Sequence, residues 1–385
     1  MKLKKVGLSL VALATATSLL LTGCSATSNS ASAGSKTTIN LYSNGSDNVR
    51  ITWEAVLEAF KAKNPNIDVK LQFVSSGTGG QSAVDRLIAA TKAGQKDTDI
   101  DIMETTDNDI SRLDSEGGKD ILSQLPADKI PNLKNINSKS TVGGDRTMVF
   151  RGSTVLLAYN SDKVATPPKT DKELYEWIKS HPGRFAYNDP TTGGSGDSFV
   201  FTALYNMLPA EALTSSDPKW KDQWQPGFDQ LKELHSYMYK ASGKVQYPAK
   251  NQGTIDLLAS GEVDIIPAWA DMILDQKSRG LLPQSIKLTQ ITPAFTGGVQ
   301  TLAIPSLSKN KEAAYKLLDF VASPEGQKLF VEKQKAIPVI DNSQLPKETL
   351  AMLAGLDVKE FRSYSIGKLN DDEKKMWQET IATLK

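Results

Sequence analysis

The chain has 385 residues, and its 45 basic and 44 acidic side chains leave a formal charge of +1 at neutral pH. So small a charge gives no support for a surface that binds nucleic acid. With one cysteine and two histidines, the chain has neither an intrachain disulfide nor a cysteine and histidine cluster for a transition metal.

The N-terminus predicts export and lipid anchoring. Three lysines at positions 2, 4 and 5 precede an apolar run over residues 6–21, which is typical of a secretory signal peptide. The following Leu21-Thr22-Gly23-Cys24 resembles a lipobox, so we expect removal of residues 1–23, lipidation of Cys24 and attachment to the outer face of the cell membrane. Residues 24–36 are small and polar and predict a flexible tether. The alternative is a secreted protein in which Cys24 is incidental.

The first part of the folded body alternates strands and helices. Strands are predicted at 37–42, 67–74 and 99–103, and the spacing of Trp53, Val56, Leu57 and Phe60 predicts a helix between the first two. A second helix is expected around residues 84–88. This order predicts right-handed crossovers and a mostly parallel sheet.

A second α/β region is predicted over residues 172–298. A strand at 155–159 and a segment at 161–170, which we expect to cross between two lobes, lead into it, and a strand at 299–304 returns. The region holds predicted strands at 184–187 and 263–267, a glycine-rich loop at 191–196 and a helix at 228–239. The remainder is predicted to be helical at 311–321, 325–335, 347–354 and 371–384.

Three stretches resemble the bacterial extracellular solute-binding family 1: residues 303–327, with Ala303-Ile304-Pro305-Ser306-Leu307 and Ser323-Pro324-Glu325-Gly326-Gln327, residues 60–69 and residues 159–163. Residues 188–196 look like the polyamine, thiamine and iron-binding branch of that family. The resemblance implies a two-lobed, periplasmic-binding-protein-like type II α/β fold, with a mostly parallel sheet in each lobe and a hinge between them. It also implies a monomer without a cofactor that captures a small-molecule solute and docks on an ABC permease.

The predicted domain boundaries follow from the two crossings. Lobe 1 is expected to comprise residues 37–157 and 300–340, and lobe 2 residues 158–299. We expect the C-terminal helices, in residues 341–385, to pack on lobe 2.

The predicted site lies where strands end, because ligands of open α/β sheets bind outside the carboxyl ends of the strands and a hinge turns two such edges into one cleft. In lobe 1 the candidates are Ser43, Asn44, Ser76, Gly77, Thr78, Thr106 and Asp107, with Arg151 near the first crossing. In lobe 2 they are Thr191, Thr192, Gly193, Gly194, Ser195, Trp269, Asp271 and Thr296.

Each candidate has a functional and a structural interpretation. The glycine-rich loop either offers backbone N–H groups to a ligand or forms a plain turn. Trp269 stacks on a ring or cation, or packs in the core. Asp271 pairs a cationic ligand or caps a helix, and Asp107 faces the cleft or solvent. Arg151 clamps a carboxylate or phosphate, or lies on the surface.

The expected ligand is a nitrogenous organic cation, such as a thiamine-like ring or a polyamine, with an anionic organic solute or a sugar as alternatives. Ferric-ion members of the family use adjacent tyrosines, whereas Tyr237 and Tyr239 are separated by Met238. Gly193–Asp197 is similar to a nucleophile elbow, but Asp197 stands where the last glycine is required. We therefore predict no catalytic residue, and an exported hydrolase is the alternative of another class.

Overall fold

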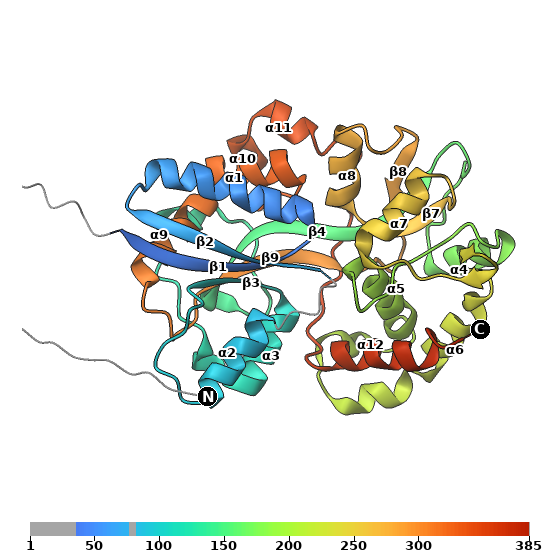
Figure 1. Cartoon of the computed structure of the whole chain (residues 1–385), viewed down its shortest axis with the longest axis horizontal. Helices are drawn as coiled ribbons and strands as arrows, with labels where there is room; N and C mark the ends of the chain where they lie inside the picture. Colours follow the sequence, from blue (N-terminus) through green and yellow to red (C-terminus); the bar gives the residue numbers. More distant parts are fainter. Residues whose placement is uncertain (1–35, 77–81, 385) are drawn as a thin grey trace, which may run out of the picture. The chain divides into compact units, whose positions relative to one another are not determined.

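The computed structural model describes residues 36–76 and 82–384, which form one compact unit with a seven-stranded sheet (Figure 1). The strands are ordered β2-β1-β3-β9-β4-β7, and β8 pairs with β4. Their bounds are β1 Thr37–Gly45, β2 Ile67–Ser75, β3 Ile102–Thr105, β4 Thr147–Asn160, β7 Ile265–Trp269, β8 Ile286–Thr289 and β9 Gly297–Ala303. A short hairpin, β5 (Lys240–Ala241) and β6 (Lys244–Val245), lies apart from this sheet.

Lobe 1, the part built on β1, β2, β3 and the adjoining halves of β4 and β9, has a core on each face of its sheet. Its helices are α1 Asp47–Lys63, α2 Ala83–Lys92, α3 Asp107–Gly117, α9 Lys311–Val321, α10 Pro324–Leu329 and the π-helix η6 Phe330–Gln334. Ile102 packs in the cluster with α1 and α9, whereas its neighbour Met103 packs in the cluster with α2 and α3. Successive strand residues point to opposite faces, so both faces are covered by helices.

Lobe 2, the part built on β7, β8 and the second half of β4, is organised around a buried helix. Its helices are α4 Asp171–Ser180, α5 Gly194–Tyr205, α6 Gln225–His235, α7 Lys250–Ala259 and α8 Ala270–Ser278. Every residue of α5 from Ser195 to Tyr205 is buried. Val155 and Ile265 pack against α5, whereas Ala158 and Ile266 pack against α7 and α8 on the other face.

The strands β4 and β9 connect the two lobes. From Thr147 to Thr154, β4 pairs with β9, and from Val155 to Asn160 it pairs with β7 and β8. The change of partner lies within β4, so the crossing predicted at residues 161–170 was placed too late along the chain. A single long strand carries the chain across, and no separate linker is needed.

The two-lobed α/β fold is confirmed, but the mostly parallel pairing is found only among β1, β2 and β3. The pairs β3–β9, β4–β9, β4–β7 and β4–β8 are antiparallel. The prediction of a mostly parallel sheet was therefore wrong for lobe 2, because the crossing strand β4 runs opposite to both of its neighbours there. Residues 184–187 contribute only an isolated bridge from Phe185 to Ile265.

The C-terminal region contacts elements of both lobes. α11 (Lys347–Ala351) is followed by Leu353, which packs against the cluster formed by Val331, Ile340 and Leu345. α12 (Leu369–Thr380) instead buries Trp377 in the lobe 2 core. The domain boundaries drawn from the sequence stay a prediction.

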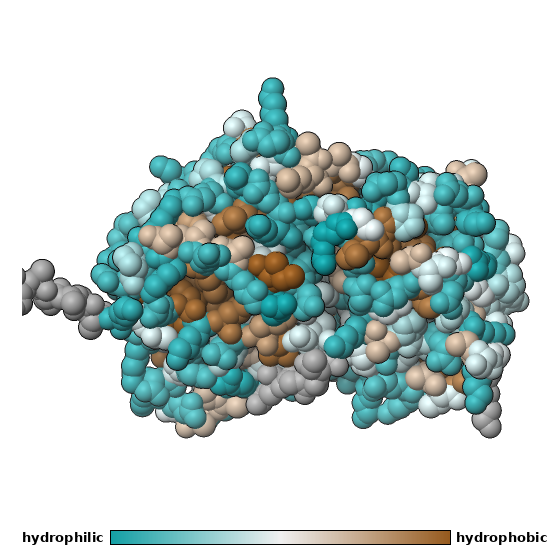
Figure 2. Space-filling model, turned by 45° about the horizontal axis from the view of Figure 1, so that its top comes forward, coloured by the Kyte–Doolittle hydropathy of each residue, from teal (hydrophilic) through white to brown (hydrophobic). Residues whose placement is uncertain are grey.

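The face of the molecule in Figure 2 is mainly hydrophilic, with apolar residues in separate groups among polar ones. In residues 36–76 and 82–384, no helix combines the length and apolarity that crossing a bilayer requires.

Candidate ligand-binding cleft

A cavity of about 390 Å³ lies between elements of the two lobes. Its wall includes the N-terminal residues of α1, α3, α5, α8 and α12, the centre of β4, the start of β9 and the segment before α12. The lining side chains are mostly polar or charged, so the cavity suits a polar solute. This is the only one of the two main cavities in the described residues to which both lobes contribute.

The structure brings nine of the predicted site residues to this cavity. They are Asn44, Ser76, Thr106, Asp107, Arg151, Gly194, Trp269, Asp271 and Thr296. Ser43, Thr191, Thr192, Gly193 and Ser195 do not line it. Gly77 and Thr78, like Cys24, lie outside the described residues.

The glycine-rich loop is mainly held by its own hydrogen bonds. The Ser195 hydroxyl donates to Oδ1 of Asn188 at 2.7 Å, and the Gly196 amide donates to the same oxygen at 2.8 Å. A Cβ on Gly196 would lie 1.8 Å from the carbonyl oxygen of Asn188, so only glycine fits there. Thr191 and Thr192 bond to Asp189. The loop therefore positions Gly194 and α5 and presents little else to the cavity.

Asp271 joins the lobes. Its Oδ1 accepts from the Ser153 hydroxyl at 2.7 Å, and its Oδ2 accepts from the side-chain amides of Asn48 at 2.8 Å and Gln334 at 3.3 Å. Asn48 lies on α1 and Gln334 on η6, both in lobe 1, whereas Asp271 lies on α8 in lobe 2. Asp271 is only 6% exposed. Its place in the first turn of α8 also stabilises its negative charge.

Arg151 is engaged within the protein. Its guanidinium forms a buried ion pair with Glu104, whose Oε2 also accepts from the Ser43 hydroxyl at 2.7 Å and, more weakly, from Nε1 of Trp53 at 3.4 Å. Ser43 therefore lies behind the wall and supports it. Because Arg151 has a carboxylate partner, its charge is neutralised before any ligand arrives.

Two acidic residues at the start of α3 face the cavity. Asp107 accepts from the hydroxyls of Ser140 at 2.5 Å and Thr141 at 2.7 Å. Thr106 and Asp109 form a capping box, and burial raises the pKa of the Asp109 carboxyl despite the bonds from Thr106. No cation lies within ion-pair distance of Asp107 in the part of the chain that the structure describes.

Trp269 ends β7 and is half-buried. A Cβ on Gly194 would lie 3.1 Å from Cζ2 of its indole, so the absence of a side chain at Gly194 makes room for the ring. The ring thus contributes an aromatic surface to the cavity next to the start of α5.

The C-terminal region also contributes to the wall, which was not predicted from the sequence; its lining residues are Arg362, Ser363, Tyr364, Asn370 and Lys374. Its helical periodicity located α12 but gave no sign of which face meets the cleft. Other polar lining residues were not predicted either, because only the packing of distant segments brings them to the cavity; among them are Asn48, Asp197, Asn251 and Gln334.

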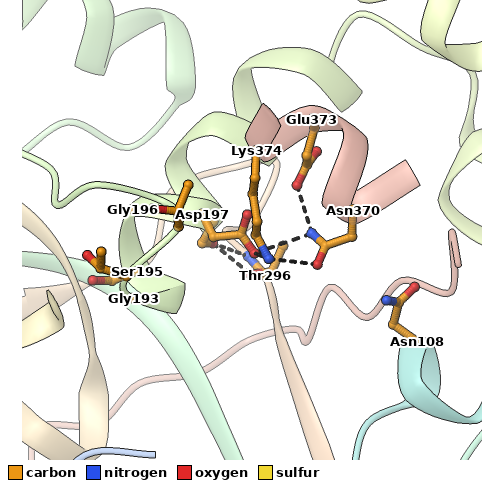
Figure 3. A network of polar contacts seen from close by, with 12 residues as sticks. Asn108, Gly193, Ser195, Gly196, Asp197, Thr296, Asn370, Glu373 and Lys374 are labelled. Atoms are coloured by element: carbon orange, nitrogen blue, oxygen red, sulfur yellow. Dashed lines mark hydrogen bonds and ion pairs between the residues drawn. The ribbon is translucent and has the colours of Figure 1, made fainter. Parts of the chain in front are cut away.

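A buried polar cluster joins α5 to α12 (Figure 3). Nζ of Lys374 lies 3.2 Å from Oδ2 of Asp197 and donates to Oδ1 of Asn370 at 2.8 Å. The Asn370 amide donates to Glu373 at 2.8 Å and to Asp197 at 3.3 Å. Burial, and then the charge of Asp197, raise the pKa of Glu373 well above its usual value. Burial lowers the pKa of Lys374, but Asp197 and Glu373 outweigh it and raise the pKa overall.

In residues 36–76 and 82–384, no three acidic, histidine or cysteine side chains are grouped to hold a metal ion.

Known proteins resemble the chain in sequence and in fold. The chain is 26% identical over 353 residues to the maltooligosaccharide ABC transporter solute-binding lipoprotein of Streptococcus pneumoniae, covering 84% of this chain and 78% of that protein. It is 24% identical over 212 residues to YnjB of Escherichia coli, covering 52% of this chain and 54% of that relative. A periplasmic thiamin binding protein of known structure shares the fold, with a TM-score of 0.63 at 18% identity over 90% of this chain and 96% of the other.

The model of the bacterial extracellular solute-binding protein family matches residues 55–354, which include most of the two lobes and the crossing strands between them. The chain therefore belongs to the bacterial extracellular solute-binding proteins.

Proposed function

We propose that this protein is the solute receptor of an ABC-type importer, which captures a small molecule in the cleft between its lobes and delivers it to a membrane permease. The observation that carries the proposal is the polar cavity walled by both lobes and spanned by β4 and β9. A hinge at these strands lets the lobes close on a solute. The name of the pneumococcal relative supports the link to an ABC transporter.

The receptor is proposed to be anchored outside the cell by lipid on Cys24, after removal of residues 1–23. This rests on the lipobox-like Leu21-Thr22-Gly23-Cys24 and agrees with the word lipoprotein in the pneumococcal relative's name. Metabolic labelling with a radioactive fatty acid tests it: the native chain should be labelled and the Cys24→Ser variant should not.

The ligand is proposed to carry a nitrogenous cationic group. Among the charged lining residues, Glu104 is paired with Arg151 and Asp197 with Lys374. Asp107 and Asp271 remain without a cation within ion-pair distance in the described residues, and hydroxyl or amide donors leave their negative charges in place. These two carboxylates favour a cationic solute, and the half-buried Trp269 adds an aromatic face for it.

A sugar is the second candidate, because the pneumococcal relative is named for maltooligosaccharides and Trp269 can stack on a pyranose ring as well.

Calorimetric titration with polyamines, thiamine, amino-acid-like zwitterions, organic anions and maltotriose tests the proposal. Trp269→Ala and Asp107→Asn should each weaken binding of a cationic solute by about 1–3 kcal/mol, because both line the cavity. Trp177→Ala, on α4, and Asp120→Asn, on the surface, are the matched controls and should leave affinity unchanged. Binding that survives both cavity substitutions, or turnover of a tested solute, would contradict the proposal.

A further inference from the structure

The segment that precedes α12, residues 362–368, forms part of lobe 2, and we call it the strap. The amide of Ser365 donates to the carbonyl oxygen of Leu213 at 2.8 Å. The side chain of Ile366 is buried in the lobe 2 core. Because a backbone bond and core packing both fix it to lobe 2, the strap moves with that lobe when the cleft opens.

The strap also contacts α3 of lobe 1. Oδ1 of Asn108 accepts from the amides of Ile366 at 3.0 Å and Gly367 at 2.8 Å, and its Nδ2 donates to the carbonyl oxygen of Gly367 at 3.4 Å. Asn108, labelled in Figure 3, lies in the first turn of α3 and is only 9% exposed. Lys368 adds an ion pair with Glu116, at 3.2 Å, near the other end of α3. Together these contacts fasten the strap to lobe 1.

The backbone of the strap favours this contact. Gly367 has a φ of 60°, a left-handed conformation that glycine adopts without strain. A backbone that turns in this way directs successive N–H groups toward one acceptor, which here is the side-chain oxygen of Asn108. An alanine at position 367 would be strained, and its Cβ would lie 3.1 Å from the Cβ of Ser216. Glycine at this position therefore supports the contact with α3.

The strap contact and the bonds of Asp271 involve helices on opposite faces of the lobe 1 sheet. Asp271 accepts from Asn48 on α1, which packs on one face, whereas Asn108 belongs to α3, which packs on the other. Asn48, Asn108 and Asp271 all line the cavity. The two sets of bonds thus join the lobes at both faces of the sheet, so the cleft opens only when both are broken.

We propose that the strap is a latch, which holds the lobes together at α3 and lets the receptor reach its closed form before a solute arrives. This inference rests on the proposed receptor function and adds a control on closure. The three bonds of Asn108 are made with the protein backbone, so the latch acts on every solute alike. A more stable closed form raises the apparent affinity for each solute by the same factor, and the latch must break before a solute leaves.

The closed population of the solute-free receptor tests the latch. Single-molecule energy transfer between a label on α2 of lobe 1 and a label in the short helix Ala210–Thr214 of lobe 2 should show a minor closed population. Asn108→Leu removes all three bonds at similar side-chain volume, so it should lower the ratio of closed to open molecules about tenfold or more. Asn132→Leu is the matched control and should leave the ratio unchanged, because the Asn132 amide donates to the carbonyl oxygen of Asp319 within lobe 1.

Gly367→Ala disturbs the same contact from the strap. Gly367 does not line the cavity, so this variant separates the latch from any direct contact of Asn108 with a solute. It should also lower the closed population, and it covers the case in which Asn108→Leu does not fold. Both variants should accelerate the release of spermidine, thiamine or maltotriose, whichever binds in calorimetry, by a factor that does not depend on the solute.

The failure of the latch and the failure of the receptor function give different results. A native receptor without a closed population would overturn the latch, as would a closed population that both variants leave unchanged or a loss confined to Asn108→Leu. Solute binding in calorimetry would leave the receptor function standing in each case. An effect of both variants on closure, with no binding of any tested solute, would leave the latch standing and contradict the receptor function.

Discussion

Replacing Asp271 by asparagine tests whether this carboxylate holds the lobes together. Oδ2 of Asp271 accepts from Asn48 and Gln334, and the side-chain oxygen of an asparagine can take the same place. The amide nitrogen then faces the Ser153 hydroxyl, which can accept as well as donate. The substitution therefore keeps the three partners and removes the negative charge.

The net loss is therefore the difference between a hydrogen bond to a charged acceptor and one to a neutral acceptor, about 1 kcal/mol for the bond from Asn48. Because this bond joins α1 of lobe 1 to α8 of lobe 2, its weakening should weaken closure and hence the binding of every solute. We expect affinity to fall by about 5-fold for a neutral solute, and by more for a solute with a cationic group, which also loses an opposite charge in the cleft.

Calorimetry with two unlike ligands, together with thermal unfolding, measures the effect of Asp271→Asn. Asp256→Asn is the control, because Asp256 is exposed on α7 of the same lobe and its side chain accepts from Gln252 within that helix. Unchanged affinity for both ligands would refute the reasoning. A loss of affinity confined to the cationic ligand would show that Asp271 acts on the solute through its charge and that its interlobe hydrogen bonds do not support closure.

Three further predictions concern the supports of the cleft. Trp377→Phe should lower the free energy of unfolding by about 1 kcal/mol in a denaturant titration, because it removes the 3.0 Å bond from Nε1 to the Tyr187 hydroxyl, and unchanged stability would contradict this. Gly196→Ala should lower the free energy of unfolding by about 1–3 kcal/mol or more, because the added Cβ would lie 1.8 Å from the carbonyl oxygen of Asn188. A variant as stable as the native chain would show that the loop can shift. The folded-state pKa of Glu373 is raised, so its contribution to stability is greatest below its unfolded pKa near 4.5 and is lost as pH rises. Glu373→Gln should therefore flatten the fall in melting temperature above pH 4.5, whereas Glu379→Gln, on the exposed side of α12, should not, and identical pH profiles would disprove the assignment.

Local patterns predicted most elements of this fold. The apolar spacing of α1 and α9 and the alternation in β1 and β2 are properties of short segments, and each emerged close to its predicted bounds. The predicted direction of strand pairing in lobe 2 was wrong because the direction depends on how one long strand, β4, crosses between the lobes. No local pattern distinguishes a strand that pairs with two different groups of neighbours from one that ends between them.

The candidate site was predicted where it follows from strand ends and not where it depends on side-chain partners. Asn44, Thr106 and Trp269 reach the cavity because they follow β-strands or end them. The sequence left open whether Asp271 pairs a ligand or caps a helix, and the structure shows three protein donors on it. Arg362 and Lys374 were missed because their place depends on where the C-terminal segment packs, which is set by distant contacts such as those of Asn108.

The distance between the lobes, measured with and without solute, tests the account most directly. Cys24 is the only cysteine, so a Cys24→Ser chain carrying Lys92→Cys on α2 and Glu211→Cys in lobe 2 takes a pair of fluorescent labels at two defined sites. Addition of a solute that binds in calorimetry should shift single-molecule energy transfer to a second, discrete value, with a midpoint at the calorimetric dissociation constant. Saturable binding with no change in energy transfer would contradict capture by lobe closure.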